Sequence, residues 1–312
     1  MLKKSSVVTA LVIMALGLQT GADQAFGAVA PTISPKSSTL NAAGSSHAEA
    51  VYKVFLPLLS STGQLPKAIS YLNNNIYAVG SYRATMMCLK LENTQKTALG
   101  LWETKFSNKD VQRELLAIYK PELSLTQLAE ELQDDAPLRN LLQAAATSGY
   151  KLESAEGSFF PVIDYGAYRK YKMYVTKDIR DYISIMSAES DLPSAKDNGL
   201  IIAWTEVATR ALSQESFIMA YPRSNRIAAV NSLYHMYLLG TFYGLNNTPL
   251  FHYDNLEMDL EAQKAYTSLL TKREDRTPYL EKLDGFMKLL KENGYTLDDS
   301  IEQYLSKEVP KE

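Results

Sequence analysis

One stretch of the sequence limits the fold more than any other, because residues 227–253 contain no Asp, Glu, Lys or Arg. A helix without charges is typically buried, since a helix that faces solvent carries charged side chains on its outer side. A membrane span is the competing interpretation, but Asn231 and His235 interrupt the run and Pro249 ends it. The pattern therefore predicts a buried central helix at 225–243.

Several other helices are expected from their capping residues. Ser and Thr accept hydrogen bonds from the free N–H groups of a first helical turn, so they mark helix starts when an apolar repeat follows. Seven such positions precede apolar repeats, at Ser107, Ser124, Thr176, Ser194, Ser224, Thr277 and Thr296. No Asn-Gly or Asp-Gly turn lies between alternating apolar residues, which disfavours a sheet-rich fold. We expect an all-α fold, an irregular bundle of about eight to ten helices.

The first 30 residues have the layout of a secretory signal peptide. Lys3 and Lys4 precede an apolar run at 7–18, and small residues gather near Ala28. That run is shorter than the about 20 residues that a membrane-spanning helix needs. We therefore expect the leader to be removed, which leaves no transmembrane segment in the mature chain.

The exported part of the chain is expected to consist of a linker and one domain. Residues 31–46 are rich in serine, with Pro31, Pro35 and Gly44, and this composition predicts a flexible, disordered linker. A single helical domain should then occupy 47–308, and an internal boundary, if there is one, is expected near 149–160.

Charge and cysteine content exclude several classes of function. The 32 basic and 35 acidic side chains give a net charge of −3, which disfavours nucleic acid as a partner. Cys88 is the single cysteine, so the chain cannot form an internal disulfide or a multi-cysteine zinc site. Export without disulfides fits a secreted protein of a Gram-positive-type bacterium. The turn Asp197-Asn198-Gly199 lacks calcium-loop spacing, and no zinc spacing surrounds His252, so we expect no metal and no cofactor.

Two carboxylates are candidates for general acid catalysis. Glu215 lies in the middle of the apolar face of a helix that starts after Ser194, so it should be buried and need a partner such as His235 or a tyrosine. Glu189 belongs to an acidic cluster that could supply the carboxylate pair of a glycosidase. In each case the interpretation as a structural or solvated carboxylate competes with the catalytic one.

Both glutamates precede a serine, in Glu189-Ser190 and in Gln214-Glu215-Ser216-Phe217. Each dipeptide is similar to the one that carries the catalytic glutamate of lytic transglycosylases. The Gly-Leu-Met-Gln-type segment of that family is missing after both, and the chain is not assigned to it.

The third candidate site is an aromatic and basic segment. Arg169, Lys170, Lys172 and Lys177 are interleaved with tyrosines. A spacing of three residues drifts around an α-helix, so some of these tyrosines should face solvent and form a platform for a ligand. Burial of the tyrosines at a helix boundary is the competing interpretation. The expected ligand-binding residues are Tyr165, Tyr168, Arg169, Tyr171, Lys172 and Tyr174.

These patterns support two hypotheses of function. The first is a secreted, non-catalytic helical protein of the bacterial cell envelope or extracellular space, which binds a polymer or protein partner through the aromatic and basic segment. The second is a secreted hydrolase of a peptidoglycan-type glycan, with Glu215 or Glu189 as the general acid. The first is favoured because no complete catalytic motif is present in the sequence.

Overall fold

The structure is a computed structural model of the chain, and it describes residues 39–132, 136–273 and 276–311. The predicted signal peptide at 1–30 and the first part of the predicted linker lie outside the described residues. Helix α1 (Thr39–Phe55) begins inside the predicted linker 31–46, so helical structure starts earlier than the serine-rich composition indicated.

The predicted all-α class is confirmed, because helices make up most of the described chain. The described residues form twelve α-helices, more than the about eight to ten expected. The chain divides into two compact units, and the division falls between Ile183 and Ser184. This division lies inside helix α7 (Lys177–Asp191), away from the possible boundary near 149–160, and the expected single domain at 47–308 stays a prediction. We refer to 39–183 as the N-terminal unit and to 184–311 as the C-terminal unit.

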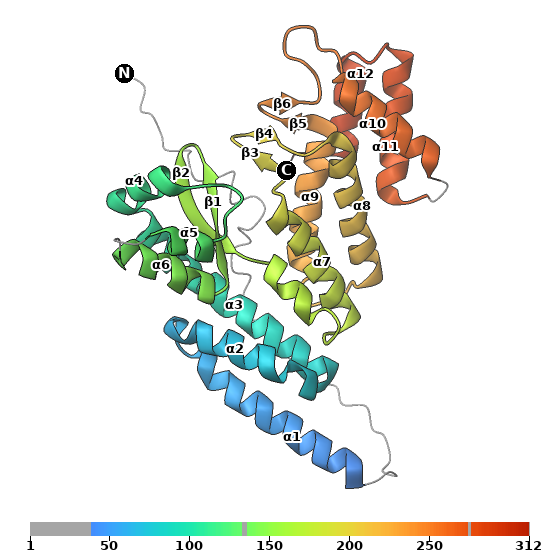
Figure 1. Cartoon of the computed structure of the whole chain (residues 1–312). Coiled ribbons are helices and arrows are strands. Elements are labelled where there is room, and N and C mark those ends of the chain that lie inside the picture. Colours follow the sequence, from blue (N-terminus) through green and yellow to red (C-terminus); the bar gives the residue numbers. More distant parts are fainter. Residues whose placement is uncertain (1–38, 133–135, 274–275, 312) are drawn as a thin grey trace. The chain divides into compact units, whose positions relative to one another are not determined.

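The N-terminal unit is built around one long helix, α3, whose buried residues include Ala84, Met87 and Leu91. Helices α1 and α2 pack against α3, and so does strand β2 (Figure 1). The predicted cap Ser124 forms a capping box with Gln127 at the start of α5. Besides α1 and the first part of α7, the elements of this unit are α2 (Leu65–Asn75), α3 (Gly80–Phe106), α4 (Lys109–Ile118), α5 (Leu125–Glu131), α6 (Ala136–Thr147), β1 (Tyr150–Ala155), β2 (Ser158–Ile163) and the 3₁₀ helices η2 (Leu56–Leu59), η3 (Thr62–Gln64), η4 (Ile76–Ala78) and η5 (Gly166–Tyr171).

The C-terminal unit contains helices α8 to α12 and two small hairpins. Helices α8 and α9 pack against each other, and α10 and α11 contact α8. Helix α8 begins at Trp204 rather than shortly after Ser194, because residues 195–200 form the first hairpin. The elements of this unit are β3 (Ala195–Lys196), β4 (Gly199–Leu200), α8 (Trp204–Ala220), α9 (Ile227–Tyr243), β5 (Gly244–Leu245), β6 (Thr248–Pro249), α10 (Leu260–Lys272), α11 (Pro278–Glu292) and α12 (Asp299–Glu308).

The uncharged run forms helix α9, but it is not buried on all sides as predicted. Val230, Leu233 and Tyr237 are buried, whereas Asn231 and His235 are exposed. The exposed side of α9 is therefore polar without being charged, which the absence of Asp, Glu, Lys and Arg alone could not reveal. In the part of the chain that the structure describes, no helix has both the length and the apolarity that a membrane crossing requires.

Candidate functional site

The predicted tyrosine platform faces the interior of the N-terminal unit. Tyr165, Tyr168 and Tyr171 are buried and only Tyr174 of the four is half-exposed, so the competing interpretation, burial of the tyrosines, holds for three of them. The physical reason is the type of helix, because Gly166–Tyr171 is a 3₁₀ helix. A 3₁₀ helix has three residues per turn, so side chains spaced by three point the same way instead of drifting around the axis.

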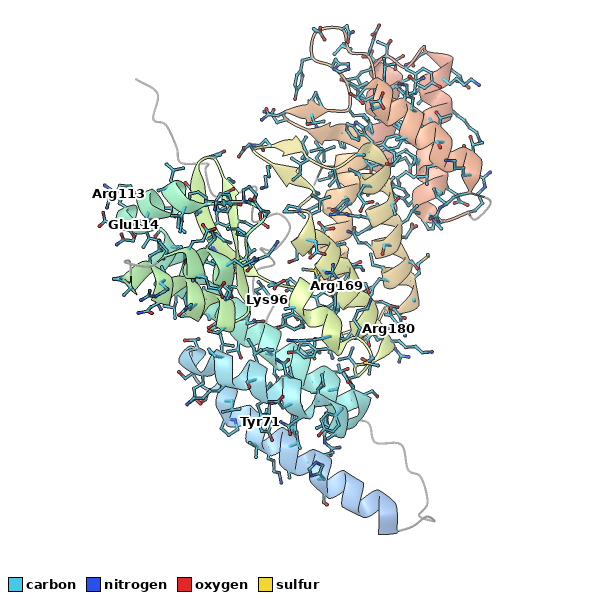
Figure 2. All side chains as sticks on the ribbon, in the orientation of Figure 1. Tyr71, Lys96, Arg113, Glu114, Arg169 and Arg180 are labelled. Atoms are coloured by element: carbon cyan, nitrogen blue, oxygen red, sulfur yellow. The ribbon has the colours of Figure 1, made fainter. Side chains whose placement is uncertain are left out.

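The buried tyrosines surround a carboxylate that the sequence analysis did not single out. Glu92 on α3 is buried, and its Oε1 accepts hydrogen bonds from the hydroxyl groups of Tyr165 at 2.7 Å and Tyr182 at 2.6 Å. Lys96, one turn further along α3, places its Nζ 2.7 Å from the same oxygen (Figure 2). A buried carboxylate needs such donors, since an unpaired charge in the interior is costly.

The next turn of α3 repeats this arrangement with an amide. The Gln95 side chain accepts a hydrogen bond from the Tyr168 hydroxyl and donates one of 2.9 Å to the carbonyl of Ser148. Burial raises the pKa of the Tyr165 and Tyr168 hydroxyls well above the ordinary value, with a further contribution from the Glu92 charge. Both phenols therefore stay protonated and act as hydrogen-bond donors. We conclude that these tyrosines stabilise the fold and do not form a ligand-binding surface.

Two hydrogen-bonded anchors hold the end of the aromatic segment against α2 and α3. The Tyr171 hydroxyl donates to Oδ1 of Asn73 at the end of α2, at 2.6 Å. The backbone N–H of Thr176 donates to Oγ1 of Thr85 in α3, at 2.8 Å. Residues 172–175 therefore run beside the connection between α2 and α3.

Exposed aromatic side chains project from that connection. Tyr77 and Tyr82 are 69% and 70% exposed, and Met173, on the anchored segment, is 80% exposed. Tyr77 follows the anchor residue Asn73 by four residues, and Tyr82 precedes the anchor residue Thr85 by one helical turn. The structure thus contains an exposed aromatic group next to the basic segment, but it is supplied mainly by tyrosines that the sequence analysis did not name.

The basic residues of the segment occupy its outer side. Arg169, Lys170 and Lys177 are exposed and Lys172 is half-exposed (Figure 2 labels Arg169). The stretch 165–177 contains these four basic side chains and no acidic one. In the described chain neither Lys172 nor Lys177 has an ion-pair partner. We call the set Tyr77, Tyr82, Arg169, Lys170, Lys172, Met173, Tyr174 and Lys177 the aromatic-basic surface.

The candidate Glu215 is buried in the C-terminal unit, as its place on the helix predicted. It is 5% exposed, and its Oε1 accepts a 2.7 Å hydrogen bond from the backbone N–H of Tyr279, with the Tyr234 hydroxyl at 3.4 Å. Tyr279 is the second residue of α11, so the carboxylate serves as an additional cap for that helix. Of the partners expected from the sequence, His235 is exposed on α9, whereas a tyrosine, Tyr234, does contact the carboxylate. The closer donor, the backbone N–H of Tyr279, was not expected.

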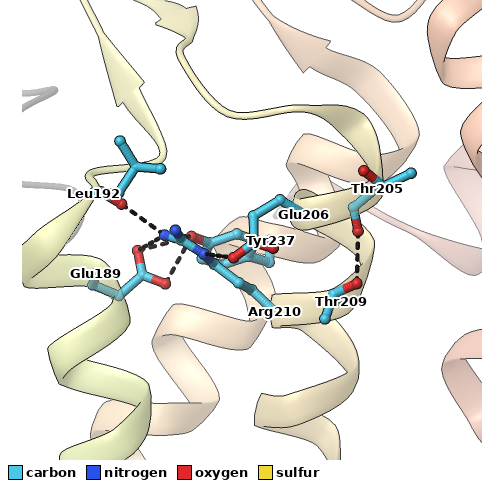
Figure 3. A network of polar contacts seen from close by, with 7 residues as sticks. All are labelled: Glu189, Leu192, Thr205, Glu206, Thr209, Arg210 and Tyr237. Carbon is cyan, nitrogen blue, oxygen red and sulfur yellow. Dashed lines mark hydrogen bonds and ion pairs between the residues drawn. The ribbon is translucent and has the colours of Figure 1, made fainter.

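The candidate Glu189 belongs to a buried ion-pair network at the end of α7 (Figure 3). The Tyr237 hydroxyl lies 2.7 Å from each of its oxygens, and Arg210 lies 3.4 Å from Oε2. Arg210 also donates to the carbonyl of Leu192 at 2.8 Å and to Glu206 at 2.8 Å. The guanidinium therefore joins α7 to α8, and the tyrosine adds α9.

The pKa values in this network follow from burial and charge. Desolvation raises the pKa of the Glu189 carboxyl, because it outweighs the opposing effects of Arg210 and Tyr237. Desolvation alone would lower the pKa of Arg210, but Glu189 and Glu206 outweigh it and hold that pKa above its ordinary value. The Tyr237 hydroxyl and Arg210 are both buried partners of the Glu189 carboxylate, an arrangement that favours a structural role.

The described residues contain no group of three or more His, Cys, Asp or Glu side chains arranged to hold a metal ion. Asp259, from the acidic turn near His252, instead accepts a hydrogen bond from Ala262 N–H and caps α10.

Cys88 is buried in α3, and burial raises the pKa of its thiol.

Comparisons with protein-family models, with curated proteins and with solved structures found no match for this chain. Any assignment of function therefore rests on the geometry of the candidate sites. Of these, the aromatic-basic surface presents its side chains to solvent, whereas Glu189 and the buried tyrosines have partners inside the protein. Glu215 is also buried and is bonded through Oε1, but its Oε2 has no hydrogen-bond partner among the described residues.

Proposed function

We propose that the chain is a secreted, non-catalytic helical protein of the cell envelope or extracellular space of a Gram-positive-type bacterium. It binds a polymer or protein partner through the aromatic-basic surface. Export is supported by the sequence of the first 30 residues, and binding is supported by the structure of the N-terminal unit.

One observation carries the binding proposal. Tyr77, Tyr82 and Met173 keep more than two thirds of their surface in solvent, beside a stretch with four basic side chains and no acidic one. Exposed aromatic rings lose little conformational entropy on binding and offer both an apolar face and a hydroxyl, so they are efficient contact residues. Adjacent cations add long-range attraction for an anionic partner.

The alternative, a glycan hydrolase, has weaker support. An acid catalyst must reach the scissile bond of its substrate, but Glu215 uses Oε1 to cap α11 and Glu189 is enclosed by Arg210 and Tyr237. The positions of these partners favour structural roles for both carboxylates.

Cosedimentation with isolated cell envelopes tests the proposal. Protein purified in its exported form should sediment with envelopes, and the double variant Tyr77→Ala/Tyr82→Ala should stay in the supernatant. Tyr253→Ala is the matched control, because Tyr253 is equally exposed at 71% but lies in the C-terminal unit. Equal sedimentation of the double variant and the control would refute binding through this surface. Release of soluble glycan fragments that stops in Glu215→Gln or Glu189→Gln would instead establish the hydrolase.

A further inference from the structure

We infer that the aromatic-basic surface recognises an anionic polysaccharide, a sugar polymer that carries carboxylate or phosphate groups. This inference rests on the proposed function and specifies its ligand. In this arrangement Tyr77 and Tyr82 contact the faces of sugar rings, while Lys172 and Lys177 contact the acidic groups.

The first argument concerns the surroundings of the rings. Exposed polar residues flank both rings in the sequence, because Asn73 and Asn74 precede Tyr77 and Ser81 precedes Tyr82. A protein interface typically has an apolar core with a polar rim. Rings interspersed with amides and hydroxyls match a sugar instead, since a sugar ring has an apolar face and hydroxyl groups at its edge.

The second argument concerns charge. The basic stretch 165–177 is anchored beside the rings by the bonds from Tyr171 to Asn73 and from Thr176 to Thr85. Three acidic groups lie near these residues: Glu49 pairs with Arg83, Asp178 accepts a hydrogen bond from Thr176, and Asp164 acts on Lys170. Together with Arg83, the four basic side chains of the stretch outnumber them. A ligand that contacts the rings therefore meets a net positive surface, which a neutral glycan would not use.

The third argument concerns the place of Lys177 in its helix. Lys177 is the first residue of α7, where the helix dipole and the free N–H groups disfavour a cation. A lysine at this position does not stabilise the helix, because a helix N-terminus prefers acidic residues. A role in binding explains why a lysine is present there. Asp178, the second residue of α7, already supplies the acidic group that the helix N-terminus favours, so the anion that Lys177 would contact must come from a ligand.

Four soluble probes test the inference by calorimetry at low salt, namely polygalacturonate, hyaluronate, dextran and inorganic polyphosphate. We expect the two uronic-acid polymers to bind, and dextran and polyphosphate to bind at least about ten-fold more weakly. Binding of the uronic-acid polymers should weaken about ten-fold in Tyr77→Ala/Tyr82→Ala and in Lys172→Gln/Lys177→Gln, and should weaken with added salt. Tyr253→Ala should bind like the wild type, and unchanged melting temperatures would show that the variants fold.

Three results would overturn the inference. Polyphosphate binding as tightly as the uronic-acid polymers would show recognition of charge without sugar. Dextran binding as tightly would show that the basic residues are not used. If neither uronic-acid polymer binds while envelope sedimentation still depends on Tyr77 and Tyr82, the ligand is another envelope component, and the proposed function stands without this inference.

Discussion

Glu215 and Tyr279 are 64 residues apart in the sequence, and the carboxylate of the first accepts a 2.7 Å hydrogen bond from the backbone N–H of the second. The bond joins the middle of α8 to the first turn of α11. Thr277, the local cap of α11, accepts only from Leu280, at 3.3 Å. Glu215 therefore satisfies a buried donor that the helix itself leaves free.

The first prediction concerns this bond. Glu215→Ala should lower the free energy of unfolding by about 1–3 kcal/mol, because it leaves the Tyr279 N–H buried without an acceptor. Glu215→Gln keeps a carbonyl oxygen in place and should cost clearly less. Urea denaturation measures both, with Ser216→Ala at the adjacent exposed position as control. Equal stability of Glu215→Ala and the control would contradict the capping role.

The second prediction concerns the carboxylate of Glu92. Tyr165→Phe and Tyr182→Phe each remove a hydrogen bond to a charged acceptor, and each should cost about 1.5–3 kcal/mol. Both donors share Oε1, so the double variant should lose more than the sum of the single variants, as Lys96 alone must then neutralise the carboxylate. A double-mutant cycle by chemical denaturation checks this, and strictly additive losses would argue against a shared site. Tyr77→Phe, at an exposed ring, is the control and should be neutral.

The third prediction concerns pH and Glu189. Burial raises the pKa of this carboxyl above its ordinary value of 4.5. Between the two values the folded protein binds a proton that the unfolded chain releases, so the contribution of Glu189 to stability is present at low pH and declines as pH rises through the folded pKa. The groups that face it are Arg210 and Tyr237, with Glu206 beyond the guanidinium.

The measurement compares the wild type with Glu189→Gln from pH 4 to pH 8. The stability of the wild type relative to this variant should fall with increasing pH. Glu292→Gln, at an exposed position in α11, provides the control for general charge effects. A relative stability that rises over this range would mean that the ion pair with Arg210 dominates over desolvation.

The fourth prediction concerns two glycines with nearly the same φ angle. Gly80 and Gly244 have φ angles of +72° and +71°, so alanine at either position should cost about 1–2 kcal/mol through backbone strain. Gly244 also has a ψ angle of −158°, a combination that is essentially restricted to glycine. A Cβ at Gly244 would collide with the carbonyl oxygen of Thr248, whereas a Cβ at Gly80 would meet nothing within 4 Å. Gly244→Ala should thus lose about 1–3 kcal/mol more than Gly80→Ala. Equal melting temperatures for the two variants would show that the β5–β6 hairpin relaxes without cost.

The sequence predicted the helical class well because helix starts leave local signals. Ser124 and Thr277 cap helices as expected, since the residue and the N–H groups it serves are close in the chain. The hairpins were missed because their turns use other residues. Glu156-Gly157 adopts positive φ angles without an Asn-Gly or Asp-Gly pair. In the second hairpin the positive φ angles fall on Asp197-Asn198, so the pair Asn198-Gly199 lies one residue later than the two turn positions that it usually marks.

The candidate sites were predicted less well because they depend on distant partners. The burial of Glu215 follows from helical periodicity and is confirmed, but its partner on α11 could not be read from α8. The burial of Tyr165 and Tyr168 depends on 3₁₀ geometry and on Glu92 and Gln95, which lie 73 residues earlier in each case. The spacing of three residues between the tyrosines was the available signal. It places them on one face in a 3₁₀ helix, which has three residues per turn, but not in an α-helix.

The partners of Glu92 also have a consequence for the order of assembly. Tyr165 and Tyr182 lie 73 and 90 residues after it, so α3 emerges from the ribosome long before its carboxylate can be neutralised by them. Forming contacts between residues so far apart closes a long loop and costs more chain entropy than forming the local contacts within a helix. The N-terminal unit should accordingly remain loosely packed until the first turns of α7 are available.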